Sequence, residues 1–271
     1  SAEPIETMQE RITAPQAPCT MLKEGISALA SAAADAYGTQ KKVQFRRKDG
    51  GYGFTCSFSD LLERAAFEEE PLTRAASILE ESGLPQDGVK TMLLILDALL
   101  TYGVECGCTA EDWQQVNEIL DYGVQVMPKL AAEHNGKVVG GGLTFLALCR
   151  PFQKYGRDHG CKKAAAVAAF AMEQPLLKLS VAAGVNSYQV YERVKALAPN
   201  QFFSLNQVGI ERSIRISEDH MDVICMGLNI QTGKICDLTE VGILHDSEDL
   251  QVILQSVKAA LTQVMNIIVL L

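Results

Sequence analysis

The residues in this chain best suited to chemistry are two short groups of thiols and an imidazole. Cys106-Gly107-Cys108 and His159-Gly160-Cys161 each place two metal-ligating residue types on either side of a glycine. Three thiolates and an imidazole can form a tetrahedral zinc site, but structural zinc sites usually separate paired cysteines by two or more residues. We therefore expect loop cysteines and a helix-capping turn here and no metal. A disulfide within the set ranks slightly ahead of a metal.

The densest polar cluster is Arg157-Asp158-His159-Gly160-Cys161. Nucleophilic catalysis needs a Cys or Ser beside a His that a third group orients. This cluster is the first place to look if the protein is an enzyme. A solvated loop between helices explains the same residues, and we favour that interpretation. No catalytic residue is assigned, and no cofactor is expected.

A run of three glycines, Gly140-Gly141-Gly142, precedes the apolar segment that starts at Leu143. Backbone amides at a helix N-terminus can bind an anion. The run lacks both the Gly-x-x-x-x-Gly-Lys-Ser/Thr pattern and the spaced glycines of a dinucleotide fingerprint. A flexible hinge is the preferred interpretation, with anion binding as the alternative.

Five cations lie within eight residues of an otherwise acidic chain: Lys41, Lys42, Arg46, Arg47 and Lys48. The whole chain has 24 basic and 33 acidic residues and a net charge of −9, which makes nucleic acid an improbable partner. The Asp-Gly step that follows the cluster, between two β-prone runs, predicts a hairpin. Its basic tip is a candidate contact for an acidic protein partner or for anionic lipid. Alternatively, the cations protect a strand edge from aggregation.

The C-terminal segment has the most regular pattern in the chain. Apolar residues follow one another at spacings of four, three, four, three, four and three: Leu250, Leu254, Val257, Leu261, Val264, Ile268 and Leu271. This spacing is typical of a helix that packs along one seam. Either the same chain or a second copy must cover this face, and we expect it to act as an assembly helix.

The remaining patterns predict a mostly helical α+β protein: a bundle-like body, a small antiparallel sheet and the C-terminal helix. Residues 1–18 read as an arm and 19–198 as a mainly helical region with a hairpin near 42–58. Residues 199–271 read as antiparallel strands plus the long helix, in a chain that could form one continuous domain. The expected helices and strands are 19–37, 59–69, 71–82, 86–102, 110–134, 142–155, 162–182 and 187–197, and 212–217, 220–230 and 235–244.

Two local signals refine this outline. Thr109 and Asp112 form a capping pair for the helix that begins near residue 110. Pro128 and Pro175 fall inside expected helices and should kink or divide them.

The composition describes a globular protein, with 48% hydrophobic and 21% charged residues. The eight cysteines are expected to be mostly reduced, which favours a cytoplasmic location, with peripheral membrane association as an option. The longest uncharged apolar runs are 12 and 13 residues, too short for a conventional transmembrane segment.

The sequence therefore predicts a non-enzymatic protein that binds partners and self-assembles. One alternative is a membrane-active protein of the pore-forming or effector type. The other is an enzyme of unrecognised type that uses the Cys/His cluster.

Overall fold

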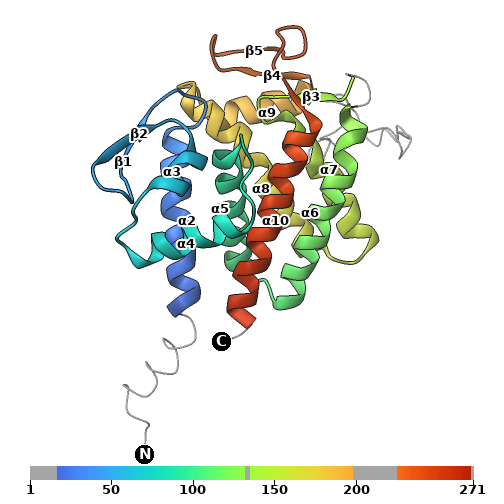
Figure 1. Ribbon diagram of the computed structural model, residues 1–271. Coiled ribbons are helices and arrows are strands. Elements are labelled where there is room, and N and C mark those ends of the chain that lie inside the picture. The colour runs from blue at the N-terminus through green and yellow to red at the C-terminus, as the bar shows by residue number, and fades with distance from the viewer. Residues whose placement is uncertain (1–16, 132–134, 198–224, 270–271) are drawn as a thin grey trace, which may run out of the picture.

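The computed structural model describes residues 17–131, 135–197 and 225–269. These residues form nine helices and six short strands (Figure 1). The helices are α2 (Ala17–Asp35), α3 (Phe58–Arg64), α4 (Glu70–Glu81), α5 (Val89–Glu105), α6 (Ala110–Ala131), α7 (Leu143–Asp158), α8 (Lys162–Ala182), α9 (Ser187–Leu197) and α10 (Ser247–Val269). The strands are β1 (Val43–Arg46), β2 (Tyr52–Thr55), β3 (Lys137–Val139), β4 (Met226–Asn229), β5 (Lys234–Asp237) and β6 (Leu244–Asp246).

Helix α5 forms the centre of the helical body. It is apolar around most of its circumference, and a helix of that kind must be covered on all sides. It packs against α2, α8 and α10. Helix α8 is rich in alanine on its buried faces, which lets α7 and α5 approach closely. The expected mostly helical α+β fold with a C-terminal helix is confirmed.

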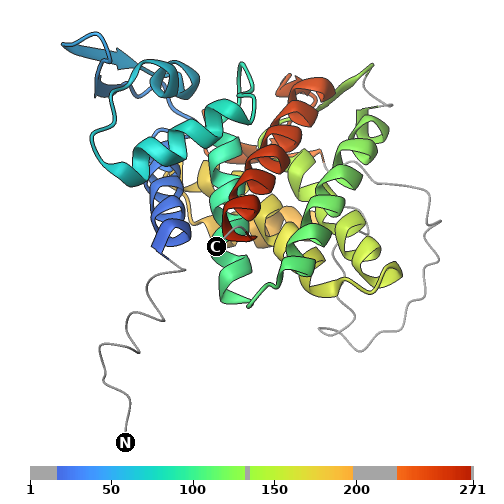
Figure 2. The same cartoon turned by 60° about the horizontal axis from the view of Figure 1, so that its bottom comes forward.

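Segments from the two ends of the described chain share this core. Helix α10 packs on α6 and α5, and it also contacts α2 and α4 (Figures 1 and 2). The buried apolar residues form one contiguous cluster that runs from Leu22 to Val264. The expected cover for the C-terminal helix is thus found within the same chain.

The strands form three separate two-stranded antiparallel pairs, where the sequence predicted one small sheet. The pairs are β1–β2, β3–β6 and β4–β5. The expected strand at 235–244 is interrupted because the Asp237 carboxylate accepts hydrogen bonds from the Thr239 amide and hydroxyl, which turns the chain. The chain then resumes as β6, which pairs with β3, a strand that the sequence did not predict. The expected strand at 212–217 and the first 16 residues of the expected arm lie outside the described residues.

Proline does not divide the helices as expected. Helices α6 and α8 continue through Pro128 and Pro175. Pro175 is buried, and its carbonyl carbon faces Gly142 at the start of α7. Tertiary packing therefore holds this segment helical in spite of the missing backbone donor.

Among the described helices, only α8 is long and apolar enough to cross a membrane by length and composition. Its most apolar 18-residue window has a mean hydropathy of 1.2, and 56% of that window is buried inside the molecule. A core helix of a globular protein meets the same criteria, and α8 packs in the core against α5, α6 and α7.

Candidate functional site

Helices α5 and α7 each have a glycine at the N-cap position. Both helices start at the end of the helical body where β3 and β4 lie (Figure 1). Gly88 precedes α5 with φ 98°, and Gly142 precedes α7 with φ 79°. In neither helix does a side chain cap the first-turn amides. Because the N-terminus of a helix carries partial positive charge and exposes amide donors, each start is suited to an anion.

The turn that ends α2 is hydrogen-bonded to the start of α5. The Lys90 ammonium, in the first turn of α5, donates to the Ala36 carbonyl at 3.2 Å. The Tyr37 and Thr91 hydroxyls share a hydrogen bond of 2.9 Å. Burial raises the pKa of Tyr37 to about 12 and lowers the pKa of Lys90. The α2 turn is therefore fixed to α5 by two partly buried hydrogen bonds.

On its other side the same turn reaches α8, which in turn packs on the start of α7. A Cβ atom added at Gly38 would lie 2.9 Å from Cδ2 of Leu179 in α8. One added at Gly142 would lie 2.6 Å from the backbone nitrogen of Leu176. The Gly140 amide donates to the Ile243 carbonyl at 2.9 Å. The glycine run is thus a packed turn that starts a helix. These contacts test neither the expected hinge nor the anion-binding alternative, and both stay predictions.

The residues next to Gly88 add polar groups to this end. Asp87 is exposed and directly precedes the glycine, while Lys90 follows in the first turn of α5. Backbone amide N–H groups donate hydrogen bonds to phosphate oxygens, and a nearby carboxylate can hold the Mg²⁺ that accompanies a nucleotide. The sequence interpretation missed Asp87 and Gly88. The available signal was a glycine immediately before an apolar helical segment.

The five basic residues lie on or beside the β1–β2 hairpin, which projects from the helical body (Figures 1 and 2). Three of them have exposed ion pairs: Arg46 with Glu68, Arg47 with Asp49 at 3.0 Å, and Lys48 with Glu80 at 3.7 Å. Within the described part of the chain, Lys41 and Lys42 form no ion pair. The hairpin also exposes two large aromatic side chains, Tyr52 at 68% and Phe54 at 64%.

The structure brings the turn at Cys106 and Cys108 close to the start of α8. The Lys163 ammonium donates to the Gly107 carbonyl at 3.4 Å and to the Asp112 carboxylate at 3.0 Å. Burial raises the pKa of the Cys108 thiol, which makes it a poorer nucleophile.

The other half of the Cys/His set has local structural roles. Cys161 is buried at the start of α8. Nδ1 of His159 lies 3.0 Å from the Tyr155 carbonyl, and the two rings stack at 3.9 Å. The described residues contain no group of three or more His, Cys, Asp or Glu arranged to hold a metal. The expected absence of metal stays a prediction.

The C-terminal apolar stripe is buried inside the chain. Leu250, Leu254, Val257, Leu261 and Val264 are between 0 and 7% exposed. The side chain of Ile268 and all of Leu271 lie outside the described residues. The role of this helix in the assembly of several copies stays a prediction.

Comparison with protein families accounts for almost the whole chain. Residues 3–269 of the 271 match the TCP-1/cpn60 chaperonin family. The chain belongs to this family. None of the curated proteins compared with it matches.

Membership of the chaperonin family corrects one expectation and supports others. Members of the family are ATPases, so the prediction of a non-enzymatic protein is wrong. Chaperonins are ATP-dependent folding chaperones that self-assemble into rings and bind substrate proteins, which confirms the general expectation of self-association and protein partners. They are soluble and typically cytosolic or organellar, and the family lends no support to membrane association.

Proposed function

We propose that this chain is a nucleotide-binding subunit of an oligomeric, chaperonin-type folding assembly, and that ATP binds where α5 and α7 begin. The observation that supports the proposal is a pair of uncapped glycine starts at one end of the body (Figure 1). Gly88 precedes α5, which is bonded to the α2 turn, and Gly142 precedes α7 and packs on α8. Bound ATP would supply a phosphoanhydride bond, and its hydrolysis to ADP and phosphate would release free energy for conformational work.

Different residues of the chain bind different parts of the nucleotide. The first-turn amides of α5 donate to phosphate oxygens, and the dipoles of α5 and α7 favour negative charge at this end. The Asp87 carboxylate is the ligand for the accompanying Mg²⁺. Lys90 acts as a positioning residue, because its ammonium group is committed to the Ala36 carbonyl and fixes the α2 turn.

Substitution of Asp87 tests the nucleotide site. We expect Asp87→Asn to lower ATP hydrolysis and Mg-ATP affinity at least about tenfold, because a neutral amide binds Mg²⁺ poorly. Asp87 is exposed, so the thermal unfolding midpoint should not change. The matched control is Glu105→Gln, which removes an exposed carboxylate at the opposite end of the same helix. Equal hydrolysis and equal affinity in Asp87→Asn and wild type would refute the assignment.

We also infer that the β1–β2 hairpin is a contact surface for a neighbouring copy of this chain. Among the residues that the structure describes, Lys41 and Lys42 have no ion-pair partner, and Tyr52 and Phe54 offer apolar area beside them. Outside the five-residue basic cluster the chain has 19 basic and 33 acidic residues, so a second copy presents the complementary charge. Aromatic residues ringed by charge are typical of protein interfaces.

Sedimentation velocity at several salt concentrations tests this contact. Lys41→Ser combined with Lys42→Ser should shift the chain toward the monomer and reduce the salt dependence of association. The control is Lys129→Ser with Lys162→Ser, which removes two exposed lysines from α6 and α8. Unchanged association in the hairpin variant, or loss of binding only to anionic vesicles, would contradict the proposed contact.

A further inference from the structure

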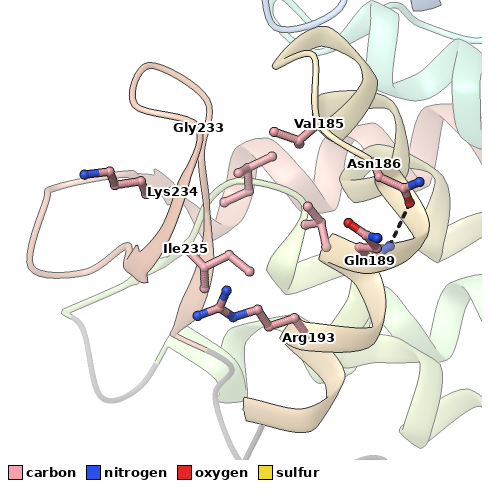
Figure 3. Close-up of a pocket in the computed structure, with 9 residues that line it drawn as sticks. Val185, Asn186, Gln189, Arg193, Gly233, Lys234 and Ile235 are labelled. Atoms are coloured by element: carbon pink, nitrogen blue, oxygen red, sulfur yellow. Dashed lines mark hydrogen bonds between the residues drawn. The ribbon is translucent and has the colours of Figure 1, made fainter.

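A second concave site lies between α9 and the β4–β5 hairpin (Figure 3). Its volume is about 380 Å³, within the range of small-molecule sites. The two faces of the hairpin have different neighbours. A Cβ atom added at Gly227 would contact Leu143 at the start of α7, whereas Leu228 and Ile235 face α9. The cavity is therefore separate from the proposed nucleotide site.

The hairpin supplies one half-buried apolar side chain, Ile235, to this cavity. Leu228 and Ile235 are directly paired across β4 and β5. Leu228 is almost fully buried, and Val190 of α9 is buried opposite it. Lys234 belongs to the rim, but its side chain points away from α9 (Figure 3).

One face of α9 supplies the polar groups. Gln189 and Arg193 are four residues apart and lie on one side of the helix, and Asn186, which directly precedes α9, continues the same side. The Asn186 side-chain oxygen accepts a hydrogen bond from the backbone amide of Gln189 at 3.0 Å. Arg193 extends from α9 toward Ile235 (Figure 3).

No acidic residue is among the described residues that line the cavity. Among the residues that the structure describes, Arg193 has no ion-pair partner. The guanidinium group thus brings uncompensated positive charge to a site whose other charged residue in the described lining, Lys234 at the rim, is also positive. A planar guanidinium matches a carboxylate through two parallel hydrogen bonds.

We propose that this cavity binds a small organic carboxylate with an apolar body. The carboxylate pairs with Arg193, and the apolar body covers the half-buried Val185 and Ile235. A ligand cation is rejected because it would meet the guanidinium in a site without a carboxylate. A short carboxylate lacks the apolar contact and therefore binds weakly.

Calorimetric titration of the full chain without nucleotide tests the site, so its outcome is independent of the ATP proposal. The probes are octanoate, octylammonium and acetate. Octanoate should bind at least about tenfold more tightly than the other two. Arg193→Gln should weaken octanoate binding by a similar factor, while Arg193→Lys retains part of it because the charge remains and the bidentate geometry is lost.

The control is Arg157→Gln, which makes the same charge change on an exposed arginine in the last turn of α7. Octanoate affinity should be unchanged in that variant. Equal binding of octylammonium, equal binding of acetate, or octanoate binding that is unchanged in Arg193→Gln would each overturn the proposal.

Discussion

At the scale of single residues, two separate constraints act on the glycines of this chain. Gly142 and Gly184 both adopt left-handed backbone angles, with φ of 79° and 70°. Only Gly142 also faces backbone atoms, since an added Cβ would lie 2.6 Å from the Leu176 nitrogen, whereas one at Gly184 would meet nothing within 4 Å. The two positions therefore separate conformational strain from steric overlap.

We expect Gly142→Ala to destabilise the fold more than Gly184→Ala does. Both variants incur the left-handed strain of about 1–2 kcal/mol, and only Gly142→Ala adds an overpacking cost of about 1–3 kcal/mol. Urea unfolding of the two variants measures the difference. Equal free energies of unfolding would mean that α7 and α8 can separate at no cost.

The capping pair predicted from the sequence, Thr109 and Asp112, is confirmed and makes stability depend on pH. The Asp112 carboxylate accepts hydrogen bonds from the Thr109 amide at 2.8 Å and the Thr109 hydroxyl at 3.0 Å. The Thr109 amide is the largest cause of the lowered pKa of Asp112, and Lys163 contributes further. A carboxyl with a lowered pKa in the folded state stabilises the fold above its ordinary pKa of 3.8.

We therefore expect Asp112→Asn to lower the unfolding midpoint at neutral pH. The gap between wild type and variant should close as the pH falls through the lowered pKa, because the wild-type carboxyl then takes up a proton. Thermal unfolding monitored by circular dichroism from about pH 7 to about pH 3 checks this. A gap that stays constant over that range would show that the charge of Asp112 has no part in the cap.

At the scale of elements, α10 is held by its own chain. Leu261 is fully buried, and α10 packs on α6 and α5. Leu261→Ala should reduce the free energy of unfolding by about 2–5 kcal/mol, the range for a buried leucine that leaves a cavity. The control is Val252→Ala on the same helix, where 42% exposure predicts a change within about 0.5 kcal/mol. Similar losses in both variants would contradict the inferred packing.

The sequence predicted elements whose signals are local. The apolar stripe from Leu250 to Val264 repeats every few residues, and the hairpin around Asp49-Gly50 turns within a few residues. The structure contains both. The pairing of β3 with β6 joins residues about a hundred positions apart. Periodicity within either segment carries no information about such a partner, so the sequence could not predict that sheet.

The candidate site was only partly predictable for the same reason. The local pattern of Gly140-Gly141-Gly142 predicts a flexible hinge first, with an anion-binding helix start as the alternative. The feature that positions the start of α5 is the α2 turn, where the Tyr37 hydroxyl is hydrogen-bonded to Thr91 and Gly38 packs against Leu179. Those contacts span 54 and more than 100 positions, so only the folded chain places the starts of α5 and α7 at one end.

At the scale of the whole molecule, the arrangement of the core predicts how the chain unfolds. Helix α2 near the start of the chain and α10 near its end contact each other and both pack on α5. The buried apolar residues belong to one cluster. Loss of any of these helices exposes the others to water, so we expect the described helices to unfold together.

The only tryptophan provides a local probe for this prediction. Trp113 of α6 is 7% exposed, and its ring fills the space beside Gly103 of α5, where an added Cβ would lie 2.1 Å from Cη2. Its fluorescence therefore reports the α5–α6 contact, while far-ultraviolet circular dichroism reports all the helices. The two signals should give coincident urea transitions with the same midpoint and slope. A fluorescence transition that clearly precedes or follows the loss of helicity would show that α5 and α6 unfold separately, and the chain would then contain more than one cooperative unit.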